Sequence, residues 1–262
     1  MLGNLFCIDL RRAVCSRAFL LTVLAMVFVE LLSAGPILSI PEFGVTEILD
    51  NLFAGTDSAS LLFMLFPLFP GALTYAKDVQ ERSVNFWLIR AEVKAYMASK
   101  YLAACASALL ALETSFVVLT FILLAMGHGL CNPLAYEVGE RLAGYLQMLQ
   151  DGNVSGYLVL YTLDRGMSAA MMAGCAVFLS AIYPNPYFAA CGPTCIYYLV
   201  LRAFPSIGSE VLLPTTWMGG GVYHSPDGGV ASFLCKMGVT LLVCGVYCAL
   251  SVWIMGRRWR HG

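Results

Sequence analysis

Residues 78–100, DVQERSVNFWLIRAEVKAYMASK, form a charged stretch between two apolar parts of the chain. With the preceding residue this stretch holds eight charged side chains, namely Lys77, Asp78, Glu81, Arg82, Arg90, Glu92, Lys94 and Lys100. It contains no Pro or Gly, and apolar residues such as Phe86, Ile89 and Val93 interleave with the charges. This pattern is typical of an amphipathic helix docked on a membrane surface. The alternative is a solvated loop that only places positive charge on one side of the membrane.

The composition of the chain indicates a polytopic membrane protein. Of its 262 residues, 60% are hydrophobic and 12% are charged, and the mean hydropathy is +0.78, whereas soluble domains carry about 25% charged residues. No long polar linker interrupts the apolar segments, so we expect a single transmembrane domain over residues 1–262. The basic N-terminus lacks a small-residue cleavage site, which argues against a cleavable signal peptide.

The apolar segments predict an all-α fold. A bilayer core is crossed by about 20 apolar residues in a helix, and six segments meet this requirement, at about 19–40, 59–76, 97–126, 165–183, 187–204 and 230–256. Pro67 and Pro70 in the second segment and Pro193 in the fifth predict kinked or broken helices there.

The basic residues orient these six spans. Eleven of the 15 Lys and Arg residues fall on one side, namely Arg11, Arg12, Arg17, Lys77, Arg82, Arg90, Lys94, Lys100, Arg257, Arg258 and Arg260. The positive-inside rule makes that side cytoplasmic, so we expect a multi-pass protein of the plasma membrane with both termini in the cytoplasm. Residues 127–164 and 205–229 are then extracytoplasmic. Residues 1–18 place apolar side chains on one helical face, which predicts an interfacial helix in contact with membrane lipid.

Six spans, an N-terminal interfacial helix and an acidic-to-basic segment between the second and third spans resemble the permease subunits of the ABC-2 family of ATP-binding-cassette transporters. The matching positions in that segment are Asp78, Glu81, Arg82, Arg90, Lys94, Tyr96 and Lys100. Two features of the family outline are absent here, since Ser83 and Val84 stand near the place of its usual Gly and Ala91 near that of its usual Pro.

The resemblance implies that residues 77–96, called here the coupling segment, receive force from a separate ABC ATPase subunit through Asp78, Glu81, Arg82, Arg90 and Lys94. It also implies a second permease subunit, identical or homologous, to complete a pathway. The chain has no G-x-x-x-x-G-K-[ST] phosphate loop, so ATP and Mg²⁺ are expected in the partner and no cofactor or enzyme activity in this chain. Export is favoured over import, and no nucleic-acid partner is expected.

Two acidic residues are predicted inside the membrane, Glu30 in the first span and Glu113 in the third. A charged side chain at the centre of a membrane helix costs about 2.5–3.5 kcal/mol on insertion scales, so it usually faces protein or water. One hypothesis is that both acids line the translocation pathway and favour cationic or polar parts of a substrate. The other is that they are protonated or hydrogen-bonded within the helix bundle.

Three basic residues near the predicted outer ends of spans, Arg165, Arg202 and Lys236, are expected to reach outward to lipid headgroups. The ten cysteines form no CxxC pair and sit mostly in apolar runs, so we predict no metal site and no catalytic set. Two further function classes stay open at this point: a membrane channel or scaffold, and a membrane-embedded enzyme that works without an ATPase.

Overall fold

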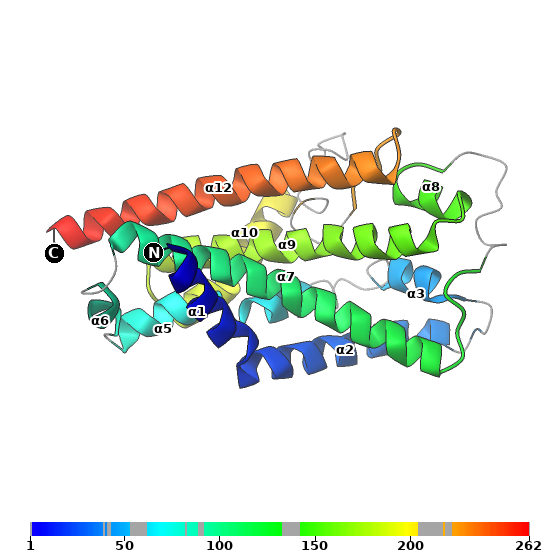
Figure 1. Cartoon of the computed structure of the whole chain (residues 1–262), viewed down its shortest axis with the longest axis horizontal. Coiled ribbons are helices and arrows are strands. Elements are labelled where there is room, and N and C mark those ends of the chain that lie inside the picture. Colours follow the sequence, from blue (N-terminus) through cyan, green and yellow to red (C-terminus); the bar gives the residue numbers. More distant parts are fainter. Residues whose placement is uncertain are drawn as a thin grey trace.

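The computed structural model describes residues 2–38, 40, 43–52, 62–81, 83–88, 92–132, 142–203, 217 and 222–261, and these residues are helical or connect helices. In chain order the elements are α1 (Leu2–Val14), α2 (Arg17–Leu38), α3 (Val45–Asn51), the short 3₁₀ helix η1 (Phe66–Leu68), α5 (Thr74–Gln80), α6 (Val84–Leu88), α7 (Val93–Ala125), α8 (Tyr145–Gln150), α9 (Val154–Ile182), α10 (Pro186–Ala203) and α12 (Gly229–His261). The long helices run side by side along the molecule (Figure 1). The predicted all-α class is therefore confirmed for the described residues.

Four helices are long and apolar enough to cross a membrane: α2, α7, α9 and α12. They coincide with the first, third, fourth and sixth predicted spans. The largest difference is at α9, which begins at Val154 rather than at residue 165. The sequence places Asp164 and Arg165 at a polar boundary, whereas in the structure both side chains are buried and the helix continues through them.

The other two predicted spans correspond to less regular parts of the bundle. Around Pro67 and Pro70 the chain forms η1 and then turns before α5 begins, so the predicted break is confirmed. The turn approaches α7 closely, since a Cβ on Gly71 would stand 2.2 Å from Ser107 Oγ. The fifth predicted span is α10, an 18-residue helix that continues through Pro193 and is not among the four membrane-length apolar helices.

The direction of the long helices shows where the chain returns along the bundle. Helices α2 and α7 run the same way along the long axis, and α9 and α12 both run the opposite way (Figure 1). The chain must therefore travel back along the bundle between α2 and α7, and again between α9 and α12. Residues 62–80 and α10 lie in those two return passages.

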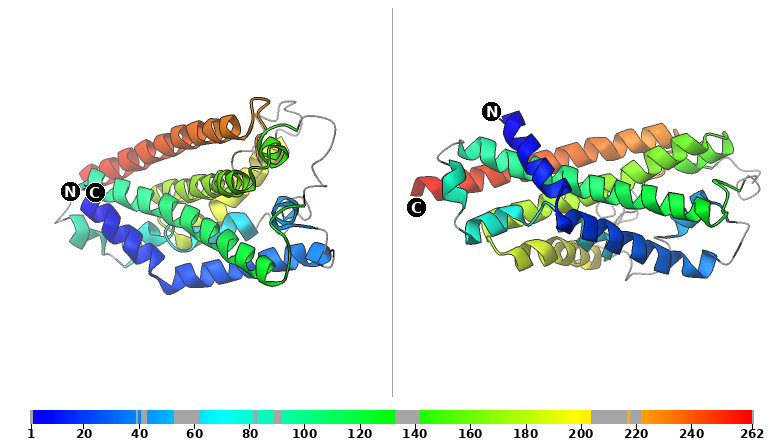
Figure 2. Two further views of the ribbon diagram at one scale, coloured as in Figure 1. Left: turned by 45° about the vertical axis from the view of Figure 1, so that its right-hand side comes forward. Right: turned by 60° about the horizontal axis from the view of Figure 1, so that its bottom comes forward.

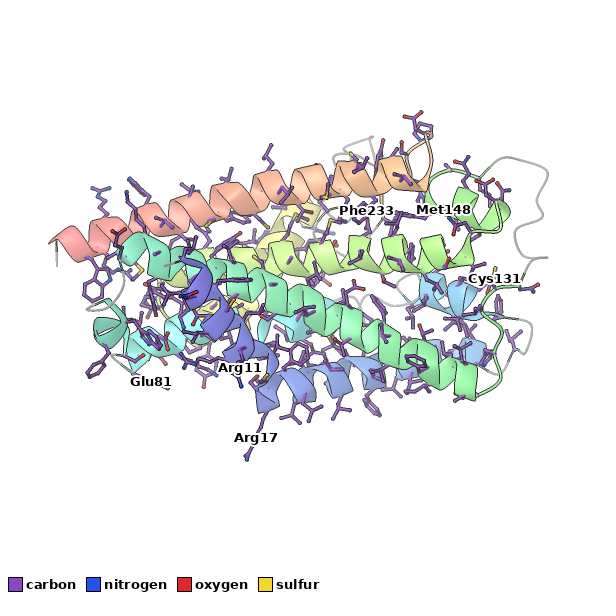
Figure 3. The ribbon with its side chains drawn as sticks, in the orientation of Figure 1. Arg11, Arg17, Glu81, Cys131, Met148 and Phe233 are labelled. Atoms are coloured by element: carbon purple, nitrogen blue, oxygen red, sulfur yellow. The ribbon has the colours of Figure 1, made fainter. Side chains whose placement is uncertain are left out.

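Both termini lie at one end of the bundle, together with α1, α5 and α6, while α3 and α8 lie at the other end (Figures 1 and 2). The side chains follow this division, with Arg11 and Glu81 toward the terminal-bearing end and Cys131 and Met148 toward the opposite end (Figure 3). We call these the near end and the far end.

Helix α9 is the centre of the bundle, since 89% of its most apolar 18-residue stretch is buried, whereas only 11% of the corresponding stretch of α12 is buried. It packs on α7 through small side chains, with Ala104 and Ala108 of α7 and Ala169 and Ala173 of α9 in one buried cluster. Small residues let membrane helices approach closely, which favours association where no hydrophobic driving force exists. The two helices thus form a close pair around which the polar sites are arranged.

The expected single amphipathic helix over residues 78–100 is wrong. Its sequence is divided among the end of α5, the short α6 and the first two turns of α7, and Glu92 has an extended backbone just before α7. The physical reason is an ion pair between Asp78 and Lys100 at 2.8 Å. In one continuous helix these two residues would be about 33 Å apart, so the chain folds back to bring them together.

Candidate functional site

The near end contains a buried ion cluster made from three elements. Lys100 of α7 lies 2.9 Å from Asp9 of α1 and 2.8 Å from Asp78 of α5, measured from Nζ to the nearest carboxylate oxygen. The lysine side chain is 3% exposed, and the two acidic side chains are 10% and 9% exposed. We call Asp9, Asp78 and Lys100 the Lys100 triad. It ties the N-terminal helix, the start of the coupling segment and a membrane-length helix to one cation.

Each acid of the triad also accepts a hydrogen bond from α7. Tyr96 donates its hydroxyl to Asp78 at 2.8 Å, and Ser99 donates to Asp9 at 2.5 Å. A buried carboxylate is stable only when paired and hydrogen-bonded, and each acid here meets both conditions. Tyr96, Ser99 and Lys100 lie within five residues of one another, so the first two turns of α7 supply the cation and both hydroxyl donors.

Trp87 of α6 connects the middle of the coupling segment to the triad. Lys100 Nζ lies 5.9 Å from the centre of the Trp87 ring, and the Arg12 guanidinium of α1 lies 5.7 Å from it. Both distances fall within the range of cation–π attraction. The short helix α6 is therefore held against α1 and α7 by one aromatic side chain between two cations.

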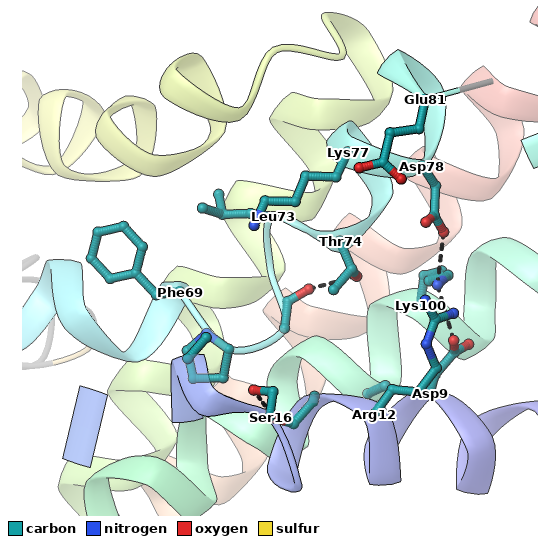
Figure 4. A pocket seen from close by; sticks show the side chains of 15 residues that line it. Asp9, Arg12, Ser16, Phe69, Leu73, Thr74, Lys77, Asp78, Glu81 and Lys100 are labelled. Carbon is teal, nitrogen blue, oxygen red and sulfur yellow. Dashed lines mark hydrogen bonds and ion pairs between the residues drawn. The ribbon is translucent and has the colours of Figure 1, made fainter. Parts of the chain in front are cut away.

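A polar cavity of about 250 Å³ lies beside the triad, between α1, α5 and α7. Arg12, Lys77 and Glu81 add further charges to its lining, and Figure 4 shows the dashed ion pairs of Lys100 at its edge. The six charged side chains that line it comprise three acids and three bases. The cavity is thus polar without an excess of either charge.

The structure separates the predicted coupling residues into two groups. Asp78 is buried and bonded inside the protein, whereas Glu81 and Lys94 are exposed at the near end. Arg82 and Arg90 lie outside the described residues. Of the predicted set, Glu81 and Lys94 are therefore the described side chains that a partner can reach, and Asp78 acts within the chain.

The two predicted intramembrane acids do not meet. Glu30 of α2 is fully buried and accepts a hydrogen bond from Ser115 of α7 at 2.7 Å. Glu113, two residues before Ser115, faces α9, where a Cβ on Gly166 would stand 2.7 Å from its Oε1. Residues two apart on a helix point to nearly opposite sides, so α7 stands between the two carboxyl groups. Both carboxyl groups have a hydrogen bond within the bundle, as in the second hypothesis, Glu30 from Ser115 and Glu113 from Thr162, and Glu113 also lines a cavity.

A second buried polar cluster, which is not among the sites predicted from the sequence, lies toward the far end. Lys236 of α12 is fully buried and lies 3.5 Å from Asp164 of α9, which also accepts a hydrogen bond from Tyr145 of α8 at 3.0 Å. We call Tyr145, Asp164 and Lys236 the Asp164 cluster. Burial, followed by the nearby Asp164 charge, raises the pKa of Tyr145, so this hydroxyl remains a donor.

The neighbouring Arg165 extends this network to α3. Arg165 donates to the Tyr161 hydroxyl, which in turn donates to Asp50 at 2.7 Å. Arg165 is 4% exposed and Lys236 is fully buried, so the prediction that these two cations reach outward to headgroups is wrong. The reason is that both cations have partners within the bundle, Lys236 at Asp164 and Arg165 at the Tyr161 hydroxyl, which donates to Asp50. Arg202, the third such residue, is exposed.

A sequence signal for this cluster exists in retrospect. Asp164 and Arg165 interrupt an otherwise apolar run, and Lys236 stands alone within another, which is the pattern of charges that must pair inside a membrane protein. Among the residues that the structure describes, no group of three or more His, Cys, Asp or Glu side chains is placed to hold a metal ion.

Comparisons with known proteins add no relatives: no protein-family model matches the chain, and neither curated proteins nor solved structures gave a match.

Proposed function

We propose that this chain is the membrane permease subunit of an ATP-binding-cassette transporter of the ABC-2 type, an exporter driven by a separate ATPase that docks on the coupling segment. The observation that carries the proposal is the Lys100 triad, because it joins the coupling segment rigidly to a membrane-length helix. The family is proposed from the resemblance of residues 77–96 to ABC-2 permeases, and the contacts of the triad offer a route for force.

The route has three steps. An ATPase would contact the exposed Glu81 and Lys94 and displace the coupling segment as it closes on ATP and Mg²⁺. Trp87 would carry that displacement to α1 and α7 through its contacts with Arg12 and Lys100. The ion pairs of Lys100 then make α5, α1 and α7 move together. A tilt of α7 alters its packing on α9, which changes access to the bundle interior.

The proposed topology has six membrane crossings. Helices α2, α7, α9 and α12 supply four, and the return passages through residues 62–80 and α10 supply two. An even number of crossings agrees with the position of both termini at the near end (Figure 2). The described basic residues at that end include Arg11, Arg12, Lys77 and Lys94, which under the positive-inside rule makes it cytoplasmic in the plasma membrane. A second permease subunit would complete the pathway.

Co-purification tests this proposal. The tagged chain is extracted from its native host in mild detergent, its partners are identified by mass spectrometry, and ATP hydrolysis is measured. The expected result is a stoichiometric ABC ATPase that is lost in a Glu81→Ala/Lys94→Ala double variant, since both side chains are exposed and neither belongs to the triad.

The matched control is an Asp151→Ala/Asp227→Ala variant, which changes two exposed residues outside the coupling segment and should retain the ATPase. A chain that purifies without any nucleotide-hydrolysing partner would contradict the proposal and favour a channel, a scaffold or a membrane-embedded enzyme. A partner that survives the Glu81/Lys94 change would place the docking surface elsewhere.

A further inference from the structure

An apolar groove of about 380 Å³ runs between α7 and α9, and Glu113 lines it. Its other walls are mainly aliphatic and aromatic, and three of them, Val117, Phe121 and Val159, are 52%, 68% and 57% exposed. The groove is therefore open on the outside of the bundle. Small-molecule sites are typically concave and apolar, with a few placed polar groups, and this groove has that composition.

Glu113 lies deep in the membrane-length part of α7. It is 13 residues after Lys100 and 12 before the end of the helix at Ala125, which places it about 20 Å and about 18 Å from those two points along the axis. Both distances exceed half of a hydrocarbon core that is about 30 Å thick. A carboxylate at this depth is costly unless it faces a partner.

One oxygen of Glu113 has no such partner among the residues that the structure describes. Its Oε1 is buried and lacks a hydrogen bond, while the carboxyl group accepts a hydrogen bond from the Thr162 hydroxyl. The ion pairs found among the described residues belong to Lys100 and Lys236, not to Glu113. Gly166 of α9 lies against this oxygen, because a Cβ at Gly166 would stand 2.7 Å from Oε1.

We infer that this groove binds a lipophilic cation, an amine or quaternary ammonium with an apolar body, whose charge sits against Glu113. The apolar walls accept the body, and the cation brings to the Glu113 carboxylate the positive charge that no ion pair among the described residues provides. A neutral acyl chain would fill the groove but leave the carboxylate unpaired. The inference rests on the proposed function only in treating the bound cation as a transported substrate.

Direct binding to the purified chain tests the site without an ATPase. In lipid nanodiscs, the fluorescent cation rhodamine 6G is titrated by anisotropy, and tetraphenylphosphonium and the neutral triphenylphosphine oxide serve as competitors. We expect tetraphenylphosphonium to compete and the neutral compound to compete much less. Glu113→Gln should weaken cation binding by about tenfold or more, as expected for loss of a buried charge-assisted contact.

Three variants keep the test specific. Glu30→Gln makes the same chemical change on the other side of α7 and should leave the dissociation constant unchanged. Glu113→Asp keeps the charge and should retain more binding than Glu113→Gln, even if both variants are less stable. Gly166→Ala should also weaken binding, because the added methyl group displaces the carboxyl group.

Three results would overturn the inference. Equal affinity of the wild type and Glu113→Gln, or equal competition by the charged and neutral compounds, would show that the groove is only an apolar surface for lipid. A photo-reactive residue at Val117 that crosslinks to a second copy of the chain rather than to the cation would identify a subunit interface. Because this assay needs no ATPase, cation binding can be measured even if co-purification finds no ATPase partner, so the transporter proposal and this inference can fail separately.

Discussion

Replacement of Lys100 by Met should destabilise the protein strongly, because it leaves two acids buried without their shared cation. The lysine contacts Asp9 and Asp78 at 2.9 and 2.8 Å and is 3% exposed. Methionine has nearly the same length and is apolar, so it fills the space while removing the charge. The variant therefore isolates the electrostatic contribution of the triad from its packing.

The magnitude follows from the geometry. Since each carboxylate has an oxygen within 3 Å of the same nitrogen, these two oxygens lie at most about 6 Å apart and would repel by at least about 3 kcal/mol at an effective dielectric constant of about 20. Removing one partner of a buried ion pair lowers the unfolding free energy by about 3–5 kcal/mol in measured cases. Tyr96 and Ser99 still donate to the acids, which keeps the expected loss of unfolding free energy at about 3–5 kcal/mol.

The assay is thermal unfolding of the purified chain in detergent, followed by intrinsic tryptophan fluorescence. A loss of this size lowers the melting temperature by about 10 °C in a chain of this length. Lys94→Met is the matched control, because Lys94 is exposed on the same helix and should unfold like the wild type. Asp9→Asn/Asp78→Asn/Lys100→Met should recover most of the loss, since it removes all three charges together. A Lys100→Met protein as stable as the Lys94→Met control would refute the triad.

Two further predictions concern the Asp164 cluster. Lys236→Met should lower the unfolding free energy by about 3–5 kcal/mol, because it leaves the fully buried Asp164 without its cation. The double variant Asp164→Asn/Lys236→Met should recover most of that loss. Equal melting temperatures of the single and double variants would exclude the ion pair. Burial raises the pKa of Tyr145 in the folded protein. The stabilisation that the Tyr145 hydroxyl provides is therefore complete below about pH 10 and falls at higher pH, where the tyrosine of the unfolded chain ionises. Alkaline titration of phenolate absorbance should therefore show no Tyr145 signal in the folded state, seen as identical folded-state curves for wild type and Tyr145→Phe.

Several features of this protein can be read from local sequence alone. The all-helical class and the four membrane-length helices follow from runs of apolar residues, since hydropathy is a property of neighbours along the chain. The helix breaks at Pro67 and Pro70 because the proline ring leaves the backbone without an N–H group to donate. The charged stretch that begins at Asp78 was likewise visible as the place where the apolar pattern stops.

The pairing of charges was decided by the tertiary structure. Lys100 and Asp78 share one apparent helix in sequence but meet only because the chain folds back between them. Arg165 and Lys236 looked like cations that reach out to headgroups, yet packing of α3, α8, α9 and α12 brings acids and tyrosines to them. Glu30 and Glu113 are equivalent in the sequence pattern, but in the structure their carboxyl groups lie on opposite sides of α7. Hydropathy measures the cost of placing a charge in the membrane, but the partner that offsets this cost comes from a distant helix, and only packing decides which one.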